Sequence, residues 1–262
     1  MTTRVERSDR RLGLRLALGL AAMFGLGVPF LLLALLVRAE WDPLIRLDTS
    51  VAEDLHDVAV RNDWLVDTLK VVSDVFDPMV FRIVVTLLAL WLLRAARRRL
   101  ALWALVTIWG AALLGWGLKL VVGRARPDLV DEVATAPGRS FPSGHSLGSW
   151  VGCGVLLLLA MPLLRGAWRA VAVALAVLVP VVVCFARVGL GVHYLSDVTA
   201  GAVLGIAWLT VTSAIFEWWR REVGLPPAPP TEAEPELGQG LPEPSSEGEP
   251  ELGDGVREPR AG

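Results

Sequence analysis

The chain has 262 residues, 54% of them hydrophobic, and its mean hydropathy is +0.54. Because the apolar residues come in long runs, this composition excludes an ordinary soluble domain and indicates an integral membrane protein. The formal net charge of −2 conceals an asymmetry, since residues 226–262 sum to −7 and the remainder of the chain to +5.

Six apolar stretches follow one another along the chain, and each is close to the length of a bilayer-spanning helix, which needs about 20 residues. The first stretch follows several arginines, but no small-residue cleavage site comes after it, so we expect a retained helix and not a signal peptide. The pattern predicts an all-α fold, an integral membrane bundle of six transmembrane helices. The expected spans are residues 12–37, 79–93, 100–122, 146–164, 170–186 and 198–216.

Arginines mark the short loops on one side of this bundle, at residues 94–99, 165–169 and 220–221. By the positive-inside rule these loops and both termini of a multi-pass cell-membrane protein are cytoplasmic. The outer loop, residues 38–78, holds ten acidic residues, and its segment from Asn62 to Val75 has apolar residues at helical spacing. We expect an amphipathic helix there, lying at the membrane surface or capping the bundle.

Three segments follow from this pattern: a basic cytoplasmic N-terminus of residues 1–11, a membrane domain of residues 12–221, and an acidic tail of residues 222–262 rich in Pro, Glu and Gly. Nine of the seventeen prolines lie in residues 226–262, which hold no aromatic residue. Such a composition cannot bury enough apolar surface to offset its ordering entropy. We therefore expect a disordered cytoplasmic tail.

The end of the third span carries the first of three polar clusters, from Lys119 to Pro127. Lys119 and Arg126 are seven residues apart and share one face if the helix continues that far, whereas Pro127 favours a helix end at Arg126. Two fixed cations, one of them a planar bidentate donor, suit the oxygens of a phosphate. Cations at a helix end also snorkel to the interface, but the positive-inside rule disfavours them on the outer side.

A second cluster, Pro142-Ser143-Gly144-His145, directly precedes the fourth span. Ser143 is a typical helix N-cap, and the backbone N–H groups of the first helical turn form an anion site. Gly144 permits close approach of the backbone to a ligand, which would place His145 beside the bound anion. Taken alone, the cluster is also compatible with a capping loop and an interfacial histidine.

The third cluster joins the fifth and sixth spans and runs from Arg187 through His193 to Asp197. His193 and Asp197 are four residues apart and share a face on a helix, so that the carboxylate can hold the imidazole's tautomer and raise its basicity. A histidine nucleophile or base requires such a partner. A simple polar pair at the start of a span is the alternative. Because all three clusters fall on the outer side of the predicted bundle, we expect them to converge into one site for an anion and for proton transfer.

The three clusters, in this order and with these internal spacings, resemble the three signature motifs of the type-2 phosphatidic acid phosphatase superfamily. The resemblance covers about residues 12–217 and implies a metal-independent phosphatase without a cofactor, working through a phosphohistidine. It implies that His193 attacks the phosphorus and that Asp197 orients His193. It also implies that His145 protonates the leaving group. The phosphoryl oxygens would be held by Lys119, Arg126, Ser143, Gly144 and Arg187.

One position departs from the family's pattern, because Ala186 stands where the family usually has a serine before the third-motif arginine. The loss of one hydroxyl donor predicts weakened phosphate binding or an altered preference. Arg124 and Arg139 are extra cations nearby. Contact with a second phosphate is one alternative for them, and we expect solvation in the loop to be their role. The remaining histidine, His56, lies in the acidic outer loop and receives no role.

We expect the substrate to be a lipid phosphate or diphosphate in the bilayer, with phosphatidic acid, phosphatidylglycerol phosphate and polyprenyl diphosphates as candidates, and no nucleic acid partner. Nothing in the sequence indicates an oligomeric state. A Ser-His-Asp hydrolase built on Ser143 lacks a Gly-x-Ser-x-Gly elbow, and a His/His/Asp metal site would face three repelling cations. A non-catalytic lipid-phosphate binding or transport protein is the alternative from another class.

Overall fold

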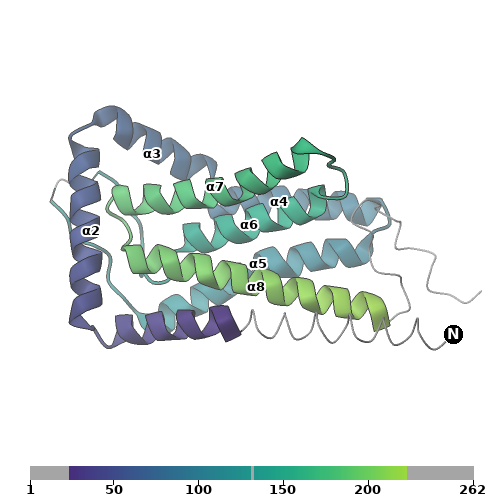
Figure 1. Cartoon of the computed structure of the whole chain (residues 1–262), viewed down its shortest axis with the longest axis horizontal. Coiled ribbons are helices and arrows are strands. Elements are labelled where there is room, and N and C mark those ends of the chain that lie inside the picture. The colour runs from purple at the N-terminus through teal and green to yellow at the C-terminus, as the bar shows by residue number, and fades with distance from the viewer. Residues whose placement is uncertain (1–23, 131–132, 223–262) are drawn as a thin grey trace, which may run out of the picture.

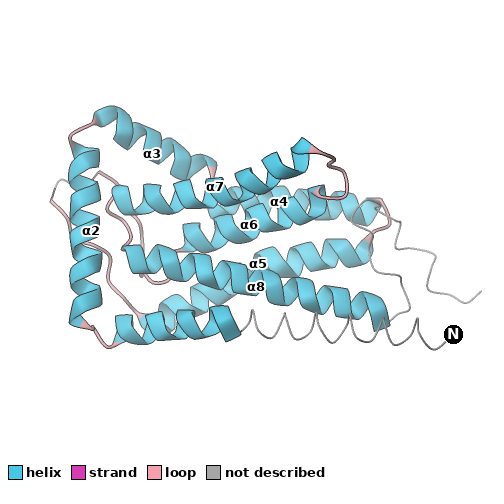
Figure 2. Ribbon diagram, viewed as in Figure 1, coloured by secondary structure: helices cyan, strands magenta, loops and turns pink. Residues whose placement is uncertain are grey.

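The computed structural model describes residues 24–130 and 133–222, and this part of the chain is all-helical, without a strand (Figures 1 and 2). The expected all-α fold is therefore confirmed. The basic N-terminus, residues 1–11, and the tail from residue 223 onward lie outside the described residues. In chain order the helices are Phe24–Arg38, α2 (Asp42–Val60), α3 (Asp63–Val75), α4 (Pro78–Arg94), α5 (Arg98–Val122), α6 (Gly144–Ala160), α7 (Ala167–Gly189) and α8 (Leu195–Glu222).

Helices lie at all six positions where spans are expected. In the described chain, four stretches are long and apolar enough to cross a membrane: Asp63–Arg94, Arg98–Val122, Ala167–Gly189 and Leu195–Trp219. The bent pair of Phe24–Arg38 and α2 makes a fifth if it is counted as one span, and α6 is a shorter apolar helix of 17 residues. The number of six spans stays a prediction, because the first expected span begins outside the described residues and α6 is short.

Helix α2 was not expected from the acidic outer loop, and it crosses the end of the helix bundle (Figure 1). It makes an angle of 91° with the helix Phe24–Arg38 that precedes it. A proline in its first turn suits a helix start, because the missing N–H has no helical partner there. The sequence conceals this helix because the stripe that it buries is small and polar instead of apolar. The buried residues are Asp48, Ala52, His56 and Ala59, spaced as one helical face.

Two expectations for the outer loop change with this helix. His56, which received no role from the sequence, is buried, and its Nε2 lies 3.0 Å from the carbonyl oxygen of Val130. The helix expected over Asn62 to Val75 is present as α3, with Asn62 as its N-cap residue. One face of α3 buries Val66 and Leu69 against α7, whereas Trp64 is exposed. Its position relative to the bilayer surface stays a prediction.

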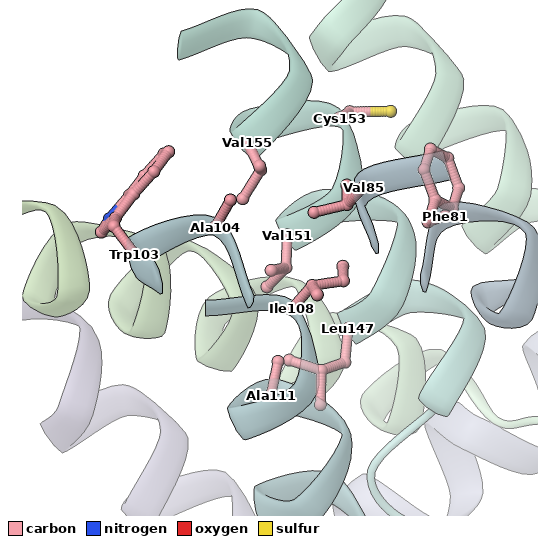
Figure 3. Close-up of a cluster of buried hydrophobic side chains, with 10 residues drawn as sticks. All are labelled: Phe81, Val85, Trp103, Ala104, Ile108, Ala111, Leu147, Val151, Cys153 and Val155. Atoms are coloured by element: carbon pink, nitrogen blue, oxygen red, sulfur yellow. The ribbon is translucent and has the colours of Figure 1, made fainter. Parts of the chain in front are cut away.

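Helix α6 occupies the centre of the bundle and packs against α4, α5, α7 and α8. Its glycines let the neighbouring helices approach closely: a Cβ added at Gly152 would lie 2.4 Å from the ring of Phe81. The main buried cluster fills the space between α4, α5 and α6 (Figure 3). The packing of α6 against these neighbours positions its first turn. The cluster consists of Phe81, Val85, Trp103, Ala104, Ile108, Ala111, Leu147, Val151, Cys153 and Val155.

Replacing Gly201 of α8 by alanine is expected to destabilise the fold. The new Cβ would lie 2.7 Å from the carbonyl oxygen of Ser143 and 2.8 Å from the Cβ of Ser146, so α8 and the start of α6 must move apart. Overpacking of this kind costs about 1–3 kcal/mol. Thermal unfolding in detergent measures the change, with Gly117→Ala on α5 as the control, since no atom lies within 4 Å of its added Cβ. Equal unfolding temperatures for the two variants would contradict this close approach.

Candidate active site

The three polar clusters of the sequence meet at the end of the bundle that α2 crosses (Figure 1). The first cluster follows the C-terminus of α5, the second opens α6, and the third joins the C-terminus of α7 to the N-terminus of α8. Alternate helices run in opposite directions, so these four helix ends fall at the same level. The structure thus brings together residues that are up to 78 positions apart, from Lys119 to Asp197.

His193 and Asp197 form a buried pair at the centre of the site. The Nδ1 atom of His193 lies 3.4 Å from Oδ2 of Asp197, although α8 begins only at Leu195 and His193 precedes it. The same carboxylate oxygen accepts hydrogen bonds from the backbone N–H of Tyr194 at 2.9 Å and from the hydroxyl of Ser140. Because these contacts engage Nδ1, the other ring nitrogen, Nε2, is the one left to meet a ligand.

The environment of His193 keeps its imidazole neutral. Burial lowers the pKa of His193 to about 4; Asp197 acts to raise it, and the charges of Arg126 and Arg187 lower it further. A neutral imidazole has a lone pair, and at neutral pH this group is therefore ready to act as a nucleophile.

Lys119 and Arg126 converge although the helix that was to carry both is shorter than required. Helix α5 ends at Val122, and Gly123 takes a left-handed conformation with φ of 70°, so Arg126 lies in the loop beyond it. The Nζ of Lys119 still donates to the carbonyl oxygen of Arg139 at 2.6 Å, and Arg126 donates to the carbonyl oxygen of Val192 at 2.7 Å. The Nη1 of Arg126 also lies 3.2 Å from Nε2 of His193. The loop after α5 thus brings Arg126 into the site, where a shared helical face with Lys119 was predicted to place it.

Arg187 is a buried cation with an unused donor. Its side chain is 7% exposed, and its Nε atom has no hydrogen-bond partner among the described residues. A buried donor without a partner is rare and calls for a ligand or water to accept from it. An anion beside His193 and Arg126 would fill that need.

The second cluster caps α6 as expected from the sequence. The hydroxyl of Ser143 accepts from the backbone N–H of Ser146 at 3.4 Å, and the backbone N–H of Ser143 donates to the carbonyl oxygen of Asp197 at 3.0 Å. The hydroxyl hydrogen of Ser143 is therefore still available to an anion, and Gly144 stands in the first turn with space around its Cα. The hydrogen bond from the Ser143 N–H to the Asp197 carbonyl joins the start of α6 to the residue that orients His193.

His145 has a carboxylate partner that the sequence did not indicate. Its Nε2 lies 3.2 Å from Oδ2 of Asp77, and the other oxygen of Asp77 accepts from the backbone N–H of Met79 as the N-cap of α4. Asp77 thus engages Nε2 and leaves Nδ1 of His145 for a ligand. A histidine held in this way can pass a proton between Nδ1 and a bound group.

Comparison with known proteins fits this arrangement. Residues 100–221 match the family model described as the PAP2 superfamily. This part of the chain is a PAP2 superfamily domain. The resemblance drawn from the three motifs is therefore confirmed, and all three motifs lie inside the matched residues.

A solved structure shares the fold over most of this chain. It is the crystal structure of the first transmembrane PAP2 type phosphatidylglycerolphosphate phosphatase from Bacillus subtilis, with a TM-score of 0.67 and 22% sequence identity. The similarity covers 77% of this chain and 98% of that chain. No functionally curated protein matches the sequence. Together with the apolar helices, the shared fold identifies a multi-pass membrane protein.

The expected role of Arg124 in the PAP2 domain is wrong. Instead of being solvated in the loop, its side chain is 10% exposed and pairs with Asp48 at 2.7 Å and with Asp197 at 2.9 Å. Arg139 is exposed, and its Nη1 donates to the carbonyl oxygen of Gly123 at 2.9 Å. Asp48 and Asp77 both precede the PAP2 domain, so neither belongs to a signature motif, and no local pattern of the sequence marks them.

Ala186, the departure from the family's third motif, is fully buried in an apolar cluster with Ala59 and Leu69. Its methyl group therefore takes part in packing α2 and α3 onto α7.

Proposed function

We propose that this PAP2 superfamily protein is a membrane phosphatase that hydrolyses a lipid phosphate or diphosphate through a phosphohistidine at His193. The observation that carries the proposal is the position of its Nε2. This atom points away from Asp197, lies beside the guanidinium of Arg126, and belongs to the same site as the unpaired donor of Arg187. A nucleophile that faces fixed cations is what phosphoryl transfer requires, because that reaction depends on positioning and charge stabilisation.

The proposed reaction has two steps. In the first, the lone pair of Nε2 attacks phosphorus, the bond to the leaving oxygen breaks, and His145 gives that oxygen its proton. In the second, His145 removes a proton from water, the water oxygen attacks phosphorus, and the bond to His193 breaks, which restores both imidazoles. Lys119, Arg126, Arg187, the Ser143 hydroxyl and the Gly144 amide hold the phosphoryl oxygens. Asp197 balances the positive charge that develops on His193.

The proposed location follows from the charge pattern. Arginine-rich loops at the opposite end of the bundle support an active site on the outer face of the membrane and termini in the cytoplasm, because such loops are usually cytoplasmic. On that face the cations of the site would meet the lipid headgroups, which supports a lipid phosphate as substrate. Phosphatidic acid, phosphatidylglycerol phosphate and a polyprenyl diphosphate remain the candidates.

Purified protein in detergent is expected to release phosphate from at least one of these three lipids in the presence of excess EDTA. The reason is that the nucleophile and the charge stabilisation come from side chains, so that no metal ion is required. A colorimetric phosphate assay across the lipid panel measures this, with and without added Mg²⁺.

Two outcomes would decide against the proposal. Binding of the lipids without phosphate release would favour a lipid-phosphate binding or transport protein. Release that appears only after Mg²⁺ is added would contradict the metal-independent reaction.

A further inference from the structure

Arg124 joins two buried carboxylates, of which only one belongs to a signature motif. Its Nη1 donates to Oδ1 of Asp197 at 2.9 Å, and its Nη2 donates to Oδ2 of Asp48 at 2.7 Å. The guanidinium also lies over the ring of Tyr194, 4.1 Å from its centroid. Two carboxylates and one aromatic ring thus hold the guanidinium of Arg124 in place. It donates to the Asp197 carboxylate behind His193 through Nη1 alone.

Asp48 is fixed as firmly as its partner. Its side chain is fully buried on α2, and besides Arg124 it accepts from the backbone N–H of Ser196 at 2.8 Å and from the hydroxyl of the same serine. Ser196 directly precedes Asp197 at the start of α8. Asp48 therefore binds both Arg124, which contacts Asp197, and the backbone of Ser196, the residue before Asp197.

The charges of this group show what Asp48 does for His193. Asp48, Arg124 and Asp197 together carry one net negative charge. Without the charge of Asp48, Arg124 could turn both Nη groups to Asp197, and a bidentate pair would leave the carboxylate less able to stabilise a positive His193.

We propose that Asp48 and Arg124 are positioning residues that set the orientation and the charge of Asp197 behind the nucleophile. This inference rests on the proposed function. It makes α2, which lies outside the PAP2 domain, part of the catalytic machinery.

Asp48→Asn is expected to slow formation of the phosphoenzyme by about 10–100-fold, in analogy to the loss of an outer partner of a metal-bound histidine. The KM for substrate should change little, because Asp48 does not touch the phosphate site. The matched control is Asp57→Asn on the same helix, since the Asp57 carboxylate is 66% exposed and pairs only with Arg61 at 3.4 Å among the contacts described. Single-turnover labelling with ³²P lipid phosphate measures the rate.

The pH profile separates a charge effect from a loss of stability. His193 feels Asp197 on α8, Arg126 in the loop after α5, Arg187 on α7 and His145 on α6. Asp48→Asn makes the surroundings more positive and should move the acid limb of kcat/KM to lower pH, whereas Arg124→Gln removes a positive charge and should move it to higher pH. Partial unfolding cannot produce shifts of opposite sign.

A pocket beside Arg124 permits a test by chemical rescue. It has a volume of about 730 Å³ and is lined by Arg124, Gly123, Tyr194 and Ile45, among others. In Arg124→Ala, guanidinium ion at a non-denaturing concentration should enter by this route and restore at least part of the lost rate. Ammonium should restore less, because it lacks the planar pair of donors.

Three results would overturn the inference. The first is equal phosphoenzyme rates for Asp48→Asn and Asp57→Asn, and the second is acid limbs that shift in the same direction. The third is the absence of rescue by guanidinium, which decides the matter where Asp48→Asn does not fold. In each case wild-type protein that still forms a phosphoenzyme leaves the proposed function standing, whereas wild-type protein that forms none overturns both.

Discussion

His193→Ala is expected to abolish phosphoenzyme formation and to lower phosphate release by at least about 10⁴-fold, as is usual when the nucleophile of a covalent mechanism is removed. The physical reason is that, among the described residues, His193 is the imidazole that has Arg126 beside Nε2 and a carboxylate behind Nδ1. Labelling with ³²P lipid phosphate, followed by acid and alkali treatment, measures the change. A phosphohistidine is lost in acid and survives alkali.

The chain offers a matched control in its third histidine. His56 is buried on α2, with Nε2 3.0 Å from the carbonyl oxygen of Val130, and it is outside the proposed reaction path. His56→Gln can keep that contact through its amide and should keep the label. A label that survives His193→Ala would refute the nucleophile assignment, whatever the overall rate.

The sequence was sufficient for the parts of the site that depend on helix ends. The three polar clusters follow the third span, precede the fourth, and join the fifth to the sixth, so they must fall on one side of a membrane bundle. The N-cap role of Ser143 follows from local chemistry alone. The pairing of His193 with Asp197 also follows from spacing, although α8 starts later than a shared helical face requires. Such features depend on residues close together in the chain, and interactions of this kind can be predicted from a single sequence.

The features that were missed depend on contacts between distant segments. Asp48 precedes Arg124 by 76 positions, and their contact arises only because α2 turns through 91° across the end of the bundle. The sequence therefore predicted Arg124 to be a solvated loop cation. Its actual partner, Asp48, lies on α2, a helix that the sequence did not predict. Likewise Gly123 ends α5 early, and the loop that follows places Arg126 beside His193.

The carboxylates behind the two histidines also differ in kind. Asp197 is fully buried, whereas the side chain of Asp77 is 40% exposed and that of His145 is 21% exposed. The nucleophile is thus shielded from water, while the proposed proton donor stands where a leaving group and then a water molecule can reach it. This division matches the two steps, since only the second requires water.

His145→Gln should therefore have an effect that depends on the leaving group. For a lipid phosphate the alkoxide must be protonated as it leaves, and loss of a general acid costs about 10²–10⁴-fold in rate. Nitrophenolate leaves without a proton, so the first step with p-nitrophenyl phosphate should proceed nearly as in the wild type. The second step still lacks its base, and the phosphoenzyme should accumulate.

Stopped-flow measurement of nitrophenolate release tests this directly. The variant should give a burst close to one equivalent per active site, followed by slow turnover, whereas the wild type should show a smaller burst or none. Asp77→Asn should show the same pattern in weaker form, because it leaves His145 in place without its charged partner at 3.2 Å. Equal losses for the lipid and the nitrophenyl substrate, without a burst, would show that His145 holds the phosphate and does not transfer the proton.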